Sequence, residues 1–309
     1  MARSRGGRHA TGPHEEGRPP RPRKRFGQNF LHDTRVIERL VGAIAPEPGQ
    51  RLVEIGPGLG ALTSALLSRV GALDVIELDR DLLPHLEEAC AGLGELRVHQ
   101  ADALKFDVCA LVEAPETTEG GTGLDTPIEA GDRLRVVGNL PYNISTPLLF
   151  HLFEQLGCIR DMHFMLQKEV VERLAAAPGG GAYGRLSVMV QYHCRVEKLF
   201  EIGPGAFRPP PKVDSAVVRL TPHAVPPVAV ADPAALARVV TDAFGQRRKT
   251  LRNALKGCLG AEAIAAAGID PGERAERLTL AQFAALADAL AARTASPPDD
   301  SSDEASDTL

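Results

Sequence analysis

The tetrapeptide Asn139-Leu140-Pro141-Tyr142 follows a run of β-branched residues and carries groups that could act on an aromatic amine. Such a nitrogen is a poor nucleophile because its lone pair is delocalised into the ring. The Asn139 side-chain oxygen and the Leu140 carbonyl could accept hydrogen bonds from the two N–H groups of the amine. These bonds would draw the nitrogen toward tetrahedral geometry. Pro141 restricts Leu140 to extended conformations, which fixes where that carbonyl points. Tyr142 offers a ring on which a base can stack. The pattern therefore predicts transfer of a group to the amine nitrogen, with the protein contributing by positioning the reactants.

A glycine-rich segment, Gly56-Pro57-Gly58-Leu59-Gly60, comes directly after the predicted strand 52–55. Glycines at the end of such a strand let a ligand approach the backbone at the edge of a sheet. Glu77 ends the next predicted strand, where a carboxylate can bind both ribose hydroxyls, and Asp102 follows the third, where it can accept a bond from an adenine amino group. The pattern favours a nucleoside cofactor. The loop alone leaves both NAD and S-adenosylmethionine open.

Short apolar runs alternate with helical patterns between these motifs. Such βα alternation predicts an α/β fold, with a parallel sheet covered by helices on both faces. Ser145 is a candidate N-cap, and the segment 187–193 is compatible with a strand or a helix. The predicted strands are 52–55, 73–78, 96–99, 134–137, 163–166 and 213–220, and the predicted helices are 61–70, 82–90, 147–155 and one ending at 174.

The rest of the chain divides by composition. Residues 1–22 form a basic tail and 296–309 an acidic tail, and both are expected to be disordered. We expect a main α/β domain over 23–224, a Pro-rich linker, and a smaller all-helical domain over 231–295. Asp232 and Pro233 would begin its first helix, and a Thr279–Gln282 capping box its last. The loop 113–132 shows no periodicity.

Several classes of protein are excluded by composition. The 309 residues include no apolar run long enough for a membrane span, and the N-terminus has no secretory signal. The five cysteines are scattered without a C-x-x-C motif, so neither a disulfide framework nor a metal site is expected. The nine histidines have no metal-ligand spacing. These features are typical of a cytoplasmic protein in a reducing compartment.

The net charge of −5 conceals a local basic cluster. Residues 244–256 contain five basic side chains and no acidic one, on a segment predicted to be helical. This cluster could be an ordinary solvated helix face, but at the start of the helical domain it is better interpreted as a phosphate-binding surface. Its members are Arg247, Arg248, Lys249, Arg252 and Lys256.

Taken together, these motifs resemble those of the KsgA/RsmA family, the small-subunit (16S) ribosomal RNA adenine N6,N6-dimethyltransferases. The resemblance extends from about residue 23 to 290 and is specific. It implies a Rossmann-like, S-adenosylmethionine-dependent methyltransferase domain with a helical C-terminal domain, and it resolves 187–193 as helical. The resembling segments are 25–31, 56–60, 76–79, 138–147, 165–169, 206–215 and 246–250.

The resemblance also implies roles for individual residues in cofactor binding. Asn29 and Leu31 would contact the methionine end of the cofactor. Gly56, Glu77 and Asp102 would hold its backbone-facing, ribose and adenine parts.

Two further residues are assigned by the resemblance at the reacting centre. Asn139 would border both cofactor and target, and Phe207 would close on the target base opposite Tyr142. The implied reaction transfers four methyl groups to N6 of two adjacent adenosines in the 3′-terminal hairpin loop of 16S RNA. Its setting would be the immature small ribosomal subunit, with the protein acting as a monomer.

Three other functions compete with this one. A large-subunit RNA adenine methyltransferase of the macrolide-resistance type would share fold and mechanism, although the runs 139–147 and 207–215 look more like KsgA. A ribosome-assembly factor that binds immature subunits, with methylation incidental, is compatible with the same residues. A NAD-dependent dehydrogenase is disfavoured by the G-x-G-x-G spacing and by the missing acid or base for hydride transfer.

Overall fold

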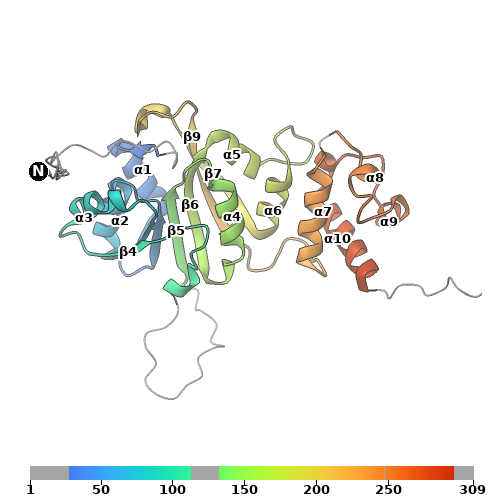
Figure 1. The fold of residues 1–309 in the computed structure, drawn as a ribbon, viewed down its shortest axis with the longest axis horizontal. Helices are drawn as coiled ribbons and strands as arrows, with labels where there is room; N and C mark the ends of the chain where they lie inside the picture. Colours follow the sequence, from blue (N-terminus) through green and yellow to red (C-terminus); the bar gives the residue numbers. More distant parts are fainter. Residues whose placement is uncertain (1–27, 113–131, 247, 296–309) are drawn as a thin grey trace, which may run out of the picture.

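The computed structural model describes residues 28–112, 132–246 and 248–295. Within them, a seven-stranded sheet flanked by helices forms the larger part, and a group of helices without strands forms the C-terminal part (Figure 1). Both predicted tails and residues 113–131 of the predicted loop lie outside the described residues, as do Arg25, Phe26 and Gly27 of the first resembling segment.

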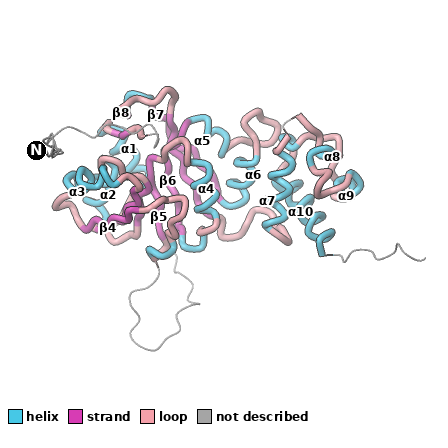
Figure 2. The backbone as a smooth tube through the Cα atoms, in the orientation of Figure 1, coloured by secondary structure: helices cyan, strands magenta, loops and turns pink. Residues whose placement is uncertain are grey.

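The central sheet is mixed rather than entirely parallel as the sequence predicted. Its first five strands are parallel neighbours, the sixth pairs antiparallel with the fifth, and the seventh pairs antiparallel with the sixth. Figure 2 shows the strands in magenta, within the larger part of the molecule. The strand order is β4 (Glu95–Gln100), β3 (Ala72–Glu77), β2 (Leu52–Ile55), β5 (Leu134–Asn139), β6 (Ile159–Gln167), β9 (Ser215–Pro222) and β7 (Cys194–Ile202).

The antiparallel end of the sheet follows from its connection. β7 and β9 are joined by residues 203–214, which hold no α-helix and therefore no crossover of the kind that parallel neighbours need. β9 pairs with β6 from Met162↔Leu220 to Gln167↔Ser215. β7 itself was not predicted, because the Cys194–Ile202 segment lacks a clear alternation.

Two hydrophobic clusters cover the faces of the sheet, one under each helical layer. The helices of the first layer are α1 (Thr34–Ile44), α2 (Ala61–Val70) and α3 (Leu83–Cys90). The helices of the second are α4 (Ser145–Phe153), α5 (Lys168–Leu174) and α6 (Arg185–His193). The helical prediction for 187–193 is thereby confirmed.

A third cluster joins α6 to the C-terminal helices. Leu186 and Val190 of α6 contribute to the sheet-side core, whereas Val188, Met189 and Tyr192 pack with the C-terminal helices. α6 therefore packs against both the sheet and the C-terminal helices. The C-terminal helices are α7 (Pro233–Phe244), α8 (Leu251–Ala254), α9 (Ala261–Ala266) and α10 (Leu280–Ala295).

Local signals for helix ends were partly right. The Asp232 side chain caps α7 by accepting from the Ala234 amide, and Thr279 and Gln282 form the predicted capping box before α10. The prediction for Ser145 was wrong: Ser145 is the first residue of α4, and its hydroxyl donates to the Tyr142 carbonyl at 3.2 Å. No described helix has the length and apolar character needed to cross a bilayer.

The expectation that the cysteines stay unpaired was also wrong. Cys109 and Cys158 form a disulfide, at a sequence separation of 49. Two 3-10 turns bring them together, Cys109–Leu111 and Leu156–Cys158, the second of which immediately precedes β6. Spacing along the sequence could not reveal this pair because the contact depends on tertiary packing.

Candidate active site

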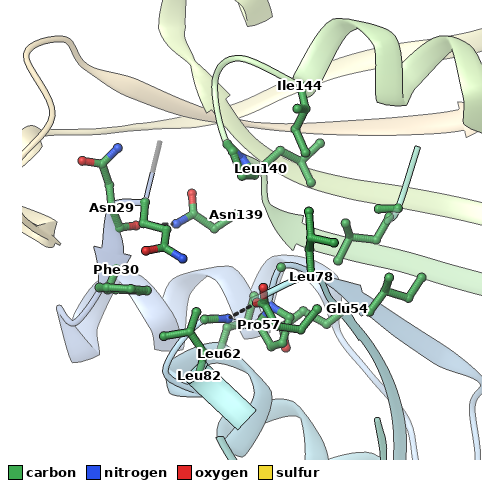
Figure 3. A pocket seen from close by; sticks show the side chains of 18 of the residues that line it. Asn29, Phe30, Glu54, Pro57, Leu62, Leu78, Leu82, Asn139, Leu140 and Ile144 are labelled. Atoms are coloured by element: carbon green, nitrogen blue, oxygen red, sulfur yellow. Dashed lines mark hydrogen bonds between the residues drawn. The ribbon is translucent and has the colours of Figure 1, made fainter. Parts of the chain in front are cut away.

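A pocket opens at the carboxyl ends of β2, β3, β5 and β6 (Figure 3). This edge of a parallel sheet is where ligands bind in open α/β folds. All six residues predicted for cofactor binding line it, together with three residues of the tetrapeptide. They are Asn29, Leu31, Gly56, Glu77, Asp102 and Asn139, with Leu140, Pro141 and Tyr142.

The glycine-rich segment forms the floor of this pocket. Gly56 and Gly58 have positive φ angles of 68° and 59°, a conformation that other residues rarely adopt. A Cβ atom on Gly58 would lie 3.0 Å from the Phe30 ring, so a side chain there would fill the cavity. The backbone thus forms a cradle that a ligand can approach closely.

Glu77 lies beneath the glycine loop, with a side chain that is almost fully buried. Its two carboxylate oxygens accept from the Asp79 amide at 2.8 Å and from the Gly58 amide at 3.3 Å. Burial raises the pKa of Glu77, and the two backbone donors oppose that shift. The carboxylate is therefore held at the end of β3, where the sequence predicted ribose binding.

Asp102 follows β4 and lines the same pocket. Its Oδ1 atom accepts from the Leu104 amide at 3.0 Å, which fixes the side chain in a local turn. Leu78, which follows Glu77 in the chain, lines the same pocket and is half exposed although apolar. An exposed leucine next to two carboxylates suits the face of an adenine ring, a feature that the sequence reasoning did not single out.

Asn139 ends β5, and its orientation is set by the N-terminal segment. Its Nδ2 atom donates to the Asn29 carbonyl at 2.9 Å, which leaves Oδ1 as the acceptor for a substrate. Just before it, Gly138 lets β5 lie close to the end of β2, because a Cβ there would lie 2.5 Å from the Ile55 carbonyl oxygen.

The backbone carbonyls of the tetrapeptide differ in whether they accept a hydrogen bond from the protein. Pro141 and Tyr142 accept bonds from Ile144 and Ser145, and the Leu140 amide donates to Met165 of β6. Within the described residues, the Leu140 carbonyl accepts none of the hydrogen bonds observed. Two acceptors, Asn139 Oδ1 and Leu140 O, are therefore in place for the two hydrogens of an amino group.

Tyr142 is half-buried at the rim of the pocket. Its hydroxyl shares a 2.9 Å hydrogen bond with Ser215 Oγ at the start of β9, and burial raises its pKa. This bond holds the phenol in place, and the ring forms part of the pocket wall. Ser215 was named in the sequence only as part of a resembling segment, and its role depends on the antiparallel β6–β9 pairing.

Phe207 is placed differently from the pocket residues. It forms β8 (Phe207–Arg208), which pairs with β1 (Phe30–Leu31) in the register Leu31↔Phe207. Its side chain is 2% exposed, and it is not among the residues lining the described pocket. Closure of Phe207 on a base opposite Tyr142 stays a prediction, and it requires this ring to leave its buried position.

Glu54, in the middle of the predicted strand 52–55, is a pocket residue that sequence reasoning missed. Its side chain is 1% exposed, and its Oε2 atom has no hydrogen-bond partner within the described structure. Burial raises the pKa of Glu54 to about 7; the nearby Thr63 hydroxyl lowers it and the negative charge of Glu77 adds to the rise. A charged residue inside an otherwise apolar strand was the available signal.

We expect Glu54→Gln to stabilise the protein at alkaline pH. Between pH 4.5, the ordinary pKa of a glutamate, and about pH 7, Glu54 keeps its proton in the folded state but has lost it in the unfolded state. The free energy of unfolding therefore falls as pH rises through this range. A neutral amide removes this dependence, giving a gain of up to about 3 kcal/mol at pH 8 and almost none at pH 4. Urea unfolding at both values, with exposed Glu95→Gln as control, measures it. An equal effect at both values would contradict it.

The basic cluster predicted on one helix lies instead on a turn and a short helix. α7 ends at Phe244, a turn follows, and α8 begins only at Leu251, so the helical prediction for 244–256 was wrong. Gly245 breaks the helix there. Arg248, Lys249, Arg252 and Lys256 are all exposed, and Arg247 lies outside the described residues.

The residues of the pocket fit a nucleoside cofactor with a charged methionine end. The glycine cradle admits a close ligand, and Glu77 and Asp102 offer acceptors at consecutive strand ends. With the mixed sheet, this site defines a Rossmann-like, S-adenosylmethionine-dependent methyltransferase. A family model described as ribosomal RNA adenine dimethylase matches residues 20–292, and the chain belongs to that family.

Individual relatives agree with this family. The chain is 61% identical over 271 residues to ribosomal RNA small subunit methyltransferase A of Pseudomonas aeruginosa, covering 88% of this chain and 95% of the relative. It is 57% identical over 265 residues to the protein of that name from Methylococcus capsulatus, covering 86% and 96%.

Solved structures show the same fold. A dimethyladenosine transferase from Plasmodium falciparum superposes with a TM-score of 0.66 at 24% identity, covering 83% of this chain and 95% of that one. The 23S rRNA methyltransferase ErmE superposes with a TM-score of 0.61 at 26% identity, covering 85% and 100%. The mixed sheet and helical C-terminal part are thus shared with RNA-modifying enzymes.

Proposed function

We propose that this protein dimethylates N6 of two adjacent adenosines in the 3′-terminal hairpin loop of small-subunit (16S) ribosomal RNA. Four methyl groups from S-adenosylmethionine are consumed for each RNA. The observation that carries the proposal is that Asn139, whose Nδ2 is taken by the Asn29 carbonyl, and Leu140, whose carbonyl accepts no bond observed among the described residues, both line a pocket suited to a nucleoside cofactor. The names of relatives 57–61% identical to this chain favour the small subunit as the source of the RNA.

The residues act by position rather than by acid–base chemistry. The bound cofactor supplies a methyl group already activated by its sulfonium. The Asn139 side-chain oxygen and the Leu140 carbonyl accept hydrogen bonds from the two amino N–H groups. These bonds turn the nitrogen lone pair toward the cofactor side of the pocket. Tyr142 holds the base plane by stacking, and its bond to Ser215 keeps the ring from rotating away. Each transfer forms an N–C bond as the S–C bond of the cofactor breaks, and the nitrogen then releases one proton to solvent. One hydrogen therefore remains after the first transfer, and one acceptor is enough for the second.

The large-subunit alternative shares this chemistry, and its structural counterpart ErmE has the same fold. Sequence identity therefore distinguishes the two candidate substrates. The small-subunit relatives are 57–61% identical to this chain, whereas ErmE is 26% identical. We infer that the substrate is the immature small subunit in the cytoplasm, and that the protein acts as a monomer. An assembly-factor role in which methylation is incidental is compatible with the same surface.

We also infer two domains with separate tasks, a methyltransferase domain over 23–224 and an RNA-binding helical domain over 231–295. Support comes from the separate core of the C-terminal helices, although α6 contributes to it. The exposed basic side chains around α8 suit the phosphates of a large structured RNA.

Loss of this basic surface should reduce the salt dependence of RNA binding. Replacing Arg248, Lys249 and Arg252 by Ala should flatten the slope of log K against log salt by about two units, since each phosphate contact contributes about 0.7–0.9. Binding titrations with small subunits at several salt concentrations measure this slope. Arg69→Ala, an exposed charge on α2, is the control. An unchanged slope in the triple variant would mean that the surface faces solvent.

The substrate itself is tested with purified protein and labelled S-adenosylmethionine. Small and large subunits that lack the modification are offered separately. Label should enter the small-subunit RNA and yield dimethyladenosine. Preferential labelling of large-subunit RNA would favour the resistance-methyltransferase function instead.

A further inference from the structure

Arg185, the first residue of α6, is an exposed cation that belongs neither to the cofactor pocket nor to the basic cluster around α8. Its guanidinium lies over the ring of Phe150 on α4, 4.8 Å from the ring centroid. Among the described residues it has no ion-pair partner. A guanidinium that stacks on a ring still presents its N–H donors at its edge, in a geometry that suits a phosphate.

α4 links this cation to the rim of the cofactor pocket. Ile144 lines the pocket, and its carbonyl accepts from the Leu148 amide, so α4 begins directly at the rim. From Ile144 to Phe150 the helix rises about 9 Å, the length of roughly two to three stacked nucleotides. Phe150 packs against both the sheet-side core and the core of the C-terminal helices. Arg185 therefore lies where the two parts of the molecule meet, and Figure 1 shows α6 between α4 and α7.

The ring beneath the guanidinium is held by other rings. Phe150 contacts Phe153 edge to face, with centroids 5.9 Å apart, and Phe153 stacks on His193 at 5.2 Å. His193 is the last residue of α6, so both ends of this helix contact α4. A cation that is already positioned by a fixed ring loses less side-chain freedom when it binds a ligand.

In the other direction, the chain before Arg185 reaches the basic cluster. Tyr183 is buried, and its hydroxyl donates to the Leu278 carbonyl at 3.0 Å. Its ring contacts Phe244 edge to face, with centroids 6.1 Å apart. Phe244 ends α7, and the segment that carries the basic cluster follows it directly. Arg185 is therefore placed between the cofactor pocket and the exposed basic side chains around α8.

The charge of this surface favours an anion. Neither α4 nor α6 contains an acidic residue, and residues 175–184, between α5 and α6, contain none. None of the carboxylates on the adjoining elements forms an ion pair with Arg185, and three of them are paired with other arginines. The paired ones are Glu169 on α5, Asp242 on α7 and Glu276 before α10, and the others are Glu154 after α4 and Glu172, which lines a separate cavity with Glu169.

We propose that Arg185 binds a backbone phosphate of the RNA strand that runs from the cofactor pocket, along the solvent-facing side of α4, toward the basic cluster around α8. Phe150 acts as a positioning residue that holds the guanidinium. The proposal rests on the proposed function, because it takes RNA as the substrate. It adds an RNA contact between the active site and the C-terminal helices, at a residue outside every motif of the sequence analysis.

Arg39 offers a matched control for Arg185. It is also exposed and lies over a ring, that of Phe200 at 4.0 Å, but it belongs to α1 on the other face of the sheet. Arg185→Ala should weaken binding to unmodified small subunits about tenfold at low salt. It should also flatten the slope of log K against log salt by about 0.7, the share of one phosphate on a single strand. Arg39→Ala should leave both quantities at their wild-type values, and equal changes in the two variants would overturn the site.

A second substitution separates charge from packing. Arg185→Lys keeps the positive charge but loses the flat surface that lies over Phe150. It should keep the wild-type salt slope, with a smaller loss of affinity than Arg185→Ala. A flattened slope in Arg185→Lys, or a wild-type slope in Arg185→Ala, would contradict a phosphate contact.

Photocrosslinking tests where the strand runs. Phe150 is replaced by p-benzoylphenylalanine, and the protein is irradiated on unmodified small subunits. Because the helix spans about 9 Å from the rim to this residue, crosslinks should map within about three nucleotides of a target adenosine. Crosslinks confined to other parts of the RNA, or no crosslink to RNA, would overturn the proposed path.

Calorimetric binding of S-adenosylmethionine should match wild type in every variant, because none of the substituted residues lines the cofactor pocket. This measurement separates the expected effects from misfolding. Wild-type protein that fails to methylate small subunits would contradict the proposed function itself. Wild-type methylation together with wild-type RNA binding by Arg185→Ala would contradict only the phosphate contact.

Discussion

Asn139→Ala should lower the single-turnover rate of methyl transfer by about 10²–10³, the loss typical of removing one hydrogen-bonding group that acts at the reacting centre. The side chain contributes its acceptor mainly as the nitrogen becomes tetrahedral, so transition-state stabilisation is what the variant loses. Binding to small subunits should stay close to wild type. Rapid-quench measurement with saturating cofactor, beside equilibrium RNA binding, gives both quantities.

Asn139 also donates to the Asn29 carbonyl, so its removal loosens a segment that lines the pocket and that we predict to contact the methionine end of the cofactor. We therefore expect a smaller loss of cofactor affinity alongside the loss of transfer. Arg69→Ala, an exposed residue of α2 away from this pocket, is the control and should be silent. A transfer rate for Asn139→Ala within about twofold of wild type would refute the positioning mechanism.

Glu77→Ala should weaken S-adenosylmethionine binding by about 1–3 kcal/mol, the range for loss of charge-assisted hydrogen bonds. That is about 5- to 150-fold in dissociation constant. The carboxylate also accepts from the Gly58 and Asp79 amides, so the glycine loop loses its support when it is removed. Calorimetry measures the affinity directly.

The control for Glu77 is Glu95→Ala, an exposed acid at the start of the neighbouring strand β4. It should leave the affinity unchanged. If Glu77→Ala also binds the cofactor as wild type does, or if the wild-type protein binds NAD instead, the cofactor assignment to this pocket fails.

Features of the site that depend on local sequence were predictable. The glycine cradle needs positive φ angles at Gly56 and Gly58, and glycine is the residue that adopts them at little cost. Parallel strands end at one edge of a sheet, so Glu77, Asp102 and Asn139 had to meet there. These residues do line one pocket.

Features that depend on pairing between distant segments were not predictable. The Tyr142–Ser215 bond requires β9 to run antiparallel to β6, and no local pattern indicates that direction. Burial of Phe207 follows from its pairing with the short strand β1. The Cys109–Cys158 contact depends on two turns separated by α4 and β5.

The central claim is the identity of the modified nucleotides, and mass spectrometry of RNA from a deletion strain tests it most directly. Ribosomal RNA from cells with and without this gene is digested, and N6,N6-dimethyladenosine is mapped to its fragment. The account predicts that both dimethyladenosines of the small-subunit 3′-terminal hairpin are lost on deletion and return with the wild-type gene, but not with Asn139→Ala. Loss of dimethyladenosine from large-subunit RNA, with the small-subunit hairpin unchanged, would contradict it.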